Sequence, residues 1–188
     1  PSAWKRLSSS KLKWWSRILA KGENLARGYG SIFAGHARIH AIEPTQYGRF
    51  SRNWQDEQAL DVLIDKLEAG QLSHKQALMQ ARKLEATTPY NLEIQNFIAN
   101  RLWALGLQYE ASEVYERAYN QAVAPIPKDF KGQVTWGEVD NRPFLRLAHG
   151  TLLGLMRRRD KAKGGEAAMA LAKQMLAWCP MDNIGVHF

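Results

Sequence analysis

The sequence predicts an all-α protein of about three helical hairpins, preceded by a basic helical arm. Three times a turn that contains glycine opens onto a helix, and each time an alanine takes the same place: Ala77, Ala111 and Ala168. The first two alanines are 34 residues apart and the last two are 57 apart, which is the same period with an insertion of 23. Such a period is typical of stacked helical hairpins. The charge distribution predicts the arm, because the whole net charge of +8 lies in residues 1–54.

Composition excludes a disordered chain and a membrane-spanning one. Hydrophobic residues make up 45% and charged residues 23% of the 188 residues, which is ordinary for a globular protein. The single cysteine, Cys179, excludes an internal disulfide framework. No apolar run approaches the roughly 18 residues that a bilayer span requires, and charges interrupt the N-terminal segment where a secretory signal needs an apolar core. We therefore expect a cytoplasmic protein.

The clearest hairpin covers residues 92–125. Its first helix, expected over 92–105, repeats apolar residues at the spacing of three or four that buries one stripe. Gly106 permits the turn, and a second helix is expected over 109–123. Antiparallel helices approach closely only where the side chains are small, and Ala99 and Ala111 supply that contact.

The stretch Gly-Leu-Gln-Tyr-Glu-Ala-Ser-Glu-Val-Tyr-Glu-Arg-Ala (106–118) resembles the middle of a tetratricopeptide (TPR) repeat, with its turn glycine, small alanine, aromatic residue and closing alanine. Pro89 and Pro180 stand where the family favours proline near a repeat's end. The resemblance extends less closely to 149–182 and to 58–91, and residues 124–145 interrupt the period. The stretches Asp-Asn-Arg-Pro-Phe-Leu-Arg (140–146) and Cys-Pro-Met-Asp-Asn-Ile-Gly (179–185) resemble those of a TPR subgroup.

The resemblance implies a protein-recognition role, because the first helix of each TPR repeat lines a concave groove. Carried over residue by residue, it places five side chains in that groove: Lys66, Asn96, Asn100, Trp103 and Arg157. The lysine, asparagine and arginine side chains can hydrogen-bond a peptide backbone or a carboxylate, and the tryptophan offers a large contact area.

The arm, residues 1–54, contains a predicted basic helix over 11–26. The side chains that we expect to meet an anionic partner are Lys11, Lys13, Trp14, Trp15, Arg17 and Lys21. An anionic membrane interface, nucleic-acid phosphates and an acidic protein all fit this composition. The alternative is structural: the apolar face of the helix covers the first repeat, because the ends of a repeat array must be covered.

Other motifs favour structural roles. His36 and His40, followed by Glu43, would face one metal ion if residues 31–42 were helical, but surface histidines are the favoured interpretation. The basic run 157–161 ends a helix, where cations interact with the negative end of the helix dipole; a nucleic-acid patch is the alternative. The sequence shows no nucleophile elbow, paired-carboxylate pattern or triad-like grouping, and packing explains Cys179. We expect neither an enzyme, nor a cofactor, nor a metal site.

The sequence therefore predicts an arm (1–54) and a TPR-like domain (55–188). We expect a scaffold or adaptor that binds a segment of a partner protein in the repeat groove. A nucleic-acid-associated protein that uses the arm and a membrane-peripheral adaptor are the alternatives. Salt separates them, because phosphate binding weakens steeply with added salt and an apolar groove responds little.

Overall fold

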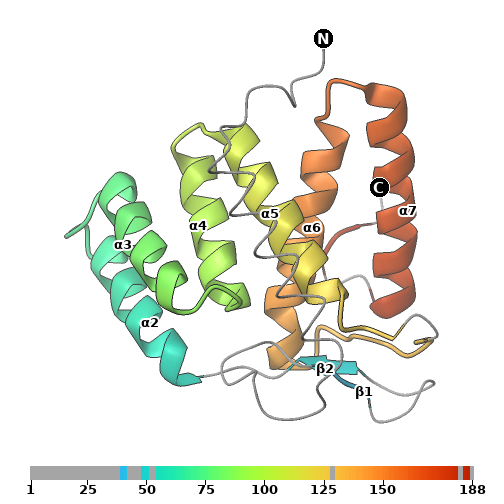
Figure 1. Cartoon of the computed structure of the whole chain (residues 1–188), viewed down its shortest axis with the longest axis horizontal. Helices are drawn as coiled ribbons and strands as arrows, with labels where there is room; N and C mark the ends of the chain where they lie inside the picture. Colours follow the sequence, from blue (N-terminus) through green and yellow to red (C-terminus); the bar gives the residue numbers. More distant parts are fainter. Residues whose placement is uncertain (1–38, 42–47, 51–53, 128–129, 182–183, 187–188) are drawn as a thin grey trace, which may run out of the picture. The chain divides into compact units, whose positions relative to one another are not determined.

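The computed structural model describes residues 39–41, 48–50, 54–127, 130–181 and 184–186, and residues 35–188 form one compact unit. Within the described residues, six α-helices follow one another (Figure 1): α2 (Trp54–Glu68), α3 (His74–Thr87), α4 (Leu92–Ala104), α5 (Gln108–Val123), α6 (Arg142–Met156) and α7 (Lys161–Trp178). The predicted all-α class is confirmed for this part of the chain, where the strands β1 (Ile39–Ala41) and β2 (Gly48–Phe50) have three residues each. The predicted helix over 11–26 lies outside the described residues.

Consecutive helices run in opposite directions, and each contacts the next (Figure 1). Gly70 turns the chain between α2 and α3 with a φ of 69°, and Gly106 does so between α4 and α5 with a φ of 77°. Glycine adopts this left-handed conformation without a steric penalty. α4 also contacts α2 and α6, the helices two places away on either side. α4 is therefore the helix through which the first and last hairpins are connected.

Side-chain caps determine where α3 and α4 begin. Ser73 Oγ accepts a hydrogen bond from the backbone N–H of Gln76, and Gln76 Oε1 accepts one from the backbone N–H of Ser73 at 2.9 Å. Asn91 Oδ1 accepts from the backbone N–H groups of Glu93 and Ile94 at 3.0 and 3.1 Å. These bonds satisfy amides that a first helical turn leaves without partners. They hold the turn before α3 and the start of α4 in place.

Phe144, in α6, lies at the centre of the core. Its ring stacks on Phe50 with 4.5 Å between centroids, and it lies 5.9 Å from the ring of Tyr119 and 5.3 Å from that of Trp178. Phe144 and Phe50 are both fully buried. Side chains from β2, α5, α6 and α7 therefore meet at one point. Phe50 belongs to this core although the sequence predicts that residues 1–54 form the arm.

β1 and β2 pair antiparallel, with Ile39 opposite Phe50. The helix over 31–42 that a metal pair of His36 and His40 would require is therefore not formed at residues 39–41. The pairing partner lies several residues further along the chain, so a local pattern does not reveal it. His40 is on a strand, and the helical i, i+4 geometry assumed for a metal pair with His36 does not apply to it; His36 and Glu43 lie outside the described residues.

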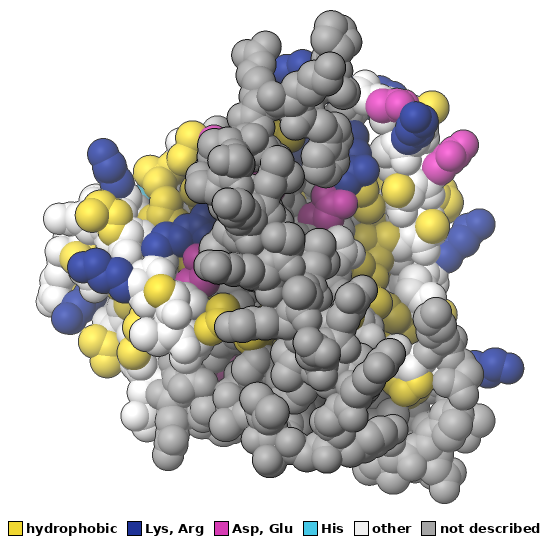
Figure 2. Space-filling model, in the orientation of Figure 1, with side chains coloured by type: hydrophobic (Ala, Val, Ile, Leu, Met, Phe, Trp, Pro, Cys, Tyr) yellow, Lys and Arg dark blue, Asp and Glu magenta, His cyan; other side chains and the backbone are white. Residues whose placement is uncertain are grey.

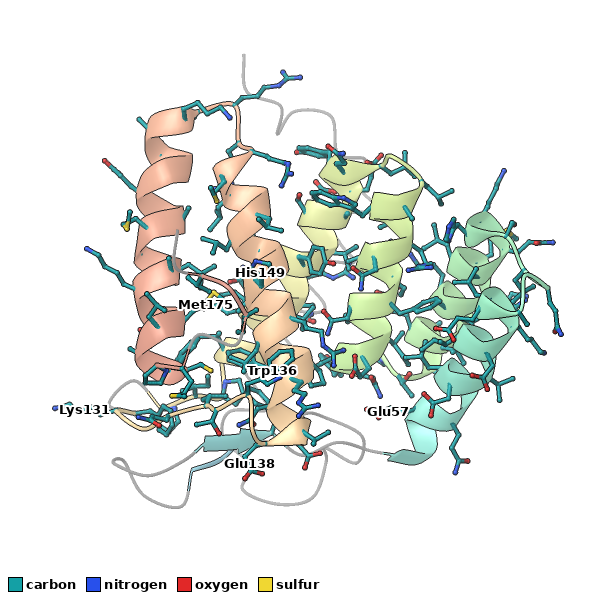
Figure 3. The ribbon with its side chains drawn as sticks, turned by 180° about the vertical axis from the view of Figure 1, so that it is seen from behind. Glu57, Lys131, Trp136, Glu138, His149 and Met175 are labelled. Carbon is teal, nitrogen blue, oxygen red and sulfur yellow. The ribbon has the colours of Figure 1, made fainter. Side chains whose placement is uncertain are left out.

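Asn141 joins the inserted segment to the helices. It lies in the 3-10 turn η2 (Val139–Asn141), directly before α6. Its Oδ1 accepts from the backbone N–H of Phe50 at 2.9 Å, and its Nδ2 donates to the carbonyl of Thr135 at 3.3 Å. Arg142 Nε donates to the carbonyl of Trp136 at 3.1 Å, which keeps Trp136 beside the first turn of α6 (Figure 3). The Asp-Asn-Arg-Pro stretch is thus a structural junction between β2, the insertion and α6.

The residues after α7 cover the last hairpin. Val186 is buried in a cluster with side chains of α6 and α7 that include Leu152 and Met175. Figure 3 shows Met175 between these two helices. Gly185, with a φ of 74°, adopts the left-handed conformation as the chain approaches Val186. An apolar face of the last hairpin is therefore withdrawn from solvent.

Candidate functional site

Asn96, Asn100 and Trp103 lie on one stripe of α4, and the structure shows this stripe contacting α5 and α6. Asn96 is 2% exposed, and its Nδ2 donates to the carbonyl of Pro143 at 2.9 Å. Asn96 therefore does not line an open groove, which corrects the assignment made by resemblance. The physical reason is that the first turn of α6 packs over this part of α4. The contact joins residues 47 positions apart, and the repeat register does not reveal it.

Asn100 is exposed but held in place. Its Oδ1 accepts a hydrogen bond of 2.7 Å from the hydroxyl of Tyr115 in α5. Burial raises the pKa of Tyr115 to about 12, although the charge of Arg101 lowers it in part. The Tyr115 hydroxyl is therefore a protonated donor at neutral pH. Asn100 can meet a partner at the surface while α5 fixes its orientation.

Trp103 and Arg157 come from different hairpins, and the structure brings them together. The guanidinium carbon of Arg157 lies 4.6 Å from the ring centroid of Trp103, which is the geometry of a cation–π contact. Arg157 also donates from Nη1 to the carbonyl of Leu153 at 3.4 Å, at the negative end of α6. This pair joins the end of α4 to the end of α6, and Arg157 is exposed.

A groove of about 660 Å³ lies between the first hairpin and α4. This volume falls within the usual range of ligand clefts. Lys66 is exposed on α2 beside the groove but does not line it. Half of the lining residues are apolar and half are polar or charged: Ile64, Leu67, Glu68, Leu72, Ser73, His74, Phe97 and Arg101.

Arg101 supplies the polar chemistry of the groove. Its Nε is buried and has no hydrogen-bond partner among the described residues. Its Nη1 lies 3.2 Å from His74 Nδ1, which accepts a hydrogen bond only when that nitrogen carries no proton. Its guanidinium carbon lies 5.1 Å from the ring centroid of Phe97. A buried N–H donor without an acceptor is unfavourable, and the residue that carries it, Arg101, also lines the groove.

Arg101, His74 and Phe97 are groove residues that the sequence reasoning missed. The TPR resemblance selects the stripe of α4 that includes Asn100, whereas Phe97 and Arg101 lie on the neighbouring stripe toward the first hairpin. The sequence signal for Phe97 and Arg101 is their spacing of four, which places an aromatic residue and a cation on the same face of a helix. That spacing alone does not show that the face borders a groove.

A polar network fixes the helices around the groove. Glu85 of α3 pairs with Arg117 of α5 at 2.8 Å and accepts a hydrogen bond from Gln95 of α4 at 3.1 Å. Gln95 is 1% exposed, and its Oε1 in turn accepts from Arg117 at 2.9 Å. One buried amide and one half-buried ion pair thus join three helices, and a network in which every member is satisfied holds its elements in a single arrangement.

Two smaller cavities lie elsewhere in the described unit. One of about 350 Å³ is lined by Trp136 and by the buried Cys179. Another of about 370 Å³ lies between α5, α6 and α7, beside the pair that Arg158 forms with Glu116. In the described ranges, no cluster of three metal-ligating side chains occurs, and no helix is long and apolar enough to cross a membrane.

The predicted anion-binding side chains Lys11, Lys13, Trp14, Trp15, Arg17 and Lys21 lie outside the described residues.

Comparison of the chain with protein families, with characterised proteins and with solved structures finds no significant match. The resemblance to TPR proteins therefore stays a prediction.

Proposed function

We propose that residues 55–188 form a TPR-like domain that binds a segment of a partner protein, as a scaffold or adaptor. The groove between the first hairpin and α4 holds an apolar side chain of that segment next to an acidic group. One observation carries the proposal: the apolar walls of this groove meet a buried arginine N–H that lacks an acceptor in the described part of the chain.

The order of the helices supports the TPR-like assignment. Gly70 and Gly106 turn two successive hairpins in the same left-handed conformation. α4 contacts both α2 and α6, as the first helices of successive hairpins do when the hairpins stack. The insertion between α5 and α6 departs from a simple array, and Asn141 joins it to the core.

The groove chemistry defines the segment. Leu67 and Phe97 offer apolar contact, and Arg101 offers donors to a carboxylate. A hydrogen bond between charged partners contributes about 1.5–3 kcal/mol when it is shielded from water. Glu68 also lines the groove, so a second acidic group nearby would be repelled. The exposed Lys66, Asn100 and Arg157, with the half-buried Trp103, provide contacts for the rest of the segment.

The proposal is tested by selecting peptides from a random library on the full chain and measuring their dissociation constants. We expect a consensus of one apolar and one acidic residue. Arg101→Gln should weaken binding roughly tenfold, because it removes the charge-assisted bond. Leu67→Ala should weaken it several-fold, and Trp103→Ala by less. The matched control is Lys83→Gln, which removes an exposed cation from α3 outside the groove.

Equal affinity of the selected peptides for Arg101→Gln, Leu67→Ala and the parent chain would refute the groove as the binding site. Salt tests the alternative class of partner. Peptide affinity should change little with ionic strength, whereas binding of a nucleic acid through the arm should fall steeply. Replacing Lys11, Lys13, Arg17 and Lys21 with Gln should leave peptide binding in the groove intact.

A further inference from the structure

Two helix–helix turns at one end of the described unit expose apolar side chains. In the turn from α4 to α5 these are Leu105, Leu107 and Tyr109, of which Tyr109 is 76% exposed. Met156, at the end of α6, is 47% exposed. The ion–ring contact between Arg157 and Trp103 places the end of α6 next to the end of α4, and both turns lie at the same end of the helices in Figure 1 and Figure 3.

The same end carries a cluster of cations. The turn from α6 to α7 and the first turn of α7 together contain five basic residues against one acidic residue, Asp160, and all of them are exposed: Arg157, Arg158, Arg159, Lys161 and Lys163. Figure 2 shows Lys and Arg side chains where α6 meets α7, beside acidic and hydrophobic ones.

Local contacts account for part of this charge. Arg158 forms a two-pronged ion pair with Glu116 at 2.6 and 2.7 Å, and Lys161 donates to the carbonyl of Met156 at 3.3 Å. Lys163 lies 3.8 Å from Asp160. Arg159 has no ion pair with any described residue. These local contacts therefore do not neutralise the segment 157–163, which keeps a net positive charge.

We propose that this edge, the two turns 104–109 and 156–163, docks on the surface of an anionic lipid bilayer. Aliphatic and tyrosine side chains that project from turns at one end can enter the boundary between headgroups and acyl chains. Neighbouring lysine and arginine side chains are attracted to the anionic headgroups. None of these residues lines the peptide groove. Arg157 alone is shared with the surface that we propose for the rest of the peptide segment.

The chemistry favours lipid over the other anionic partners. Nucleic acids would use the cations and Tyr109, but Leu105, Leu107 and Met156 have no flat ring to stack on a base. Exposed aliphatic side chains lose contact with water in a bilayer interface, which is favourable in proportion to the area buried. The edge thus combines the two contributions that a peripheral membrane surface requires, apolar area and positive charge.

The test uses the full chain and sedimentation with vesicles of phosphatidylcholine, with and without roughly one-third phosphatidylserine. The double variant Leu107→Ser/Tyr109→Ser removes apolar area, and Arg159→Gln/Lys161→Gln removes charge. Matched controls are Met169→Ser, at a methionine that is 58% exposed on α7, and Lys173→Gln on the same helix. Circular dichroism confirms that each variant keeps its helices.

Each double variant should weaken binding to the phosphatidylserine vesicles roughly tenfold, and the control variants should bind as the parent does. Hydrogen exchange should slow in peptides that cover 104–109 and 156–163 when these vesicles are present. Slower exchange confined to the arm would overturn the proposal, because the arm would then be the attachment. So would unchanged binding of both double variants, or protection of this edge by a single-stranded oligonucleotide and not by vesicles.

Discussion

The first hairpin, α2–α3, and the central pair, α5–α6, are made from helices of similar length but are packed differently. α3 buries two of its 14 residues, both alanines, whereas α6 buries nine of its 15. The crossing of α5 and α6 is so close that a Cβ atom added at Gly150 would lie 2.6 Å from Cγ of Tyr115. Between the first hairpin and α4, by contrast, there is room for a groove of about 660 Å³.

This difference in packing gives the two regions different roles. The centre joins α4, α5, α6, α7 and β2 through large buried side chains and defines the fold. The first hairpin exposes Val62 and Met79 and has fewer buried contacts to hold it. A region with few buried apolar contacts opens locally at a lower free energy than the core. The first hairpin can therefore adjust to a partner at α2, while Glu85 holds α3 to α4 and α5 and the centre stays rigid.

The largest expected effect is at the centre. Phe144→Ala should lower the free energy of unfolding by about 3–5 kcal/mol, because it removes the ring that Phe50, Tyr119 and Trp178 surround. Chemical denaturation followed by circular dichroism measures this. A loss below about 1 kcal/mol would show that the centre is not the rigid region.

Alkaline pH should also act on the centre. Burial raises the pKa of Tyr119 to about 12. Burial is also the largest influence on Tyr115, whose pKa is likewise raised to about 12. Because the unfolded chain titrates near pH 10, stability is complete below pH 10 and is lost as the pH rises toward 12. The loss should reach about 2 kcal/mol for each tyrosine. Tyr119→Phe should remove its share, which urea unfolding across this pH range detects.

A smaller effect is expected at the α5–α6 crossing. Gly150→Ala should destabilise by about 1–3 kcal/mol despite the better helix propensity of alanine, because the new methyl group meets the ring of Tyr115. Gly165→Ala is the matched control: it lies in α7, where an added Cβ meets nothing within 4 Å. It should be neutral or stabilising by up to about 1 kcal/mol. If both variants melt at the same temperature, the crossing is looser than described.

The smallest effect on stability is expected in the first hairpin. Leu67→Ala should cost only about 1 kcal/mol, because this side chain is half-buried at the groove wall. The same substitution weakens peptide binding under the proposed function. A cost as large as that of Phe144→Ala would mean that the hairpin is as rigidly packed as the centre, and the contrast between the two regions would not hold.

Local patterns predicted most of the helices. The helix expected over 92–105 is formed as α4 (Leu92–Ala104), and the one expected over 109–123 as α5 (Gln108–Val123). Helical periodicity and a glycine turn depend on residues close together in the chain, so a sequence displays them. Ala99 and Ala111, where we expect the two helices to approach closely, are both fully buried.

The candidate site was predicted only in part. Trp103 and Arg157 were assigned to one surface and do lie together. Asn96 was assigned to the same surface but is covered by the start of α6. Arg101 and His74, which line the groove, were missed because the family register selects a different stripe of α4.

The sequence by itself determined the two helices of the hairpin over 92–125, where glycine turns the chain, and that the whole net charge lies in residues 1–54. Only the tertiary structure decided which face of each helix is covered. The reason is physical: a helical period depends on neighbours three or four residues away, whereas burial depends on segments far along the chain. Pro143 covers Asn96 from 47 positions away, and the first hairpin leaves Arg101 beside an open groove.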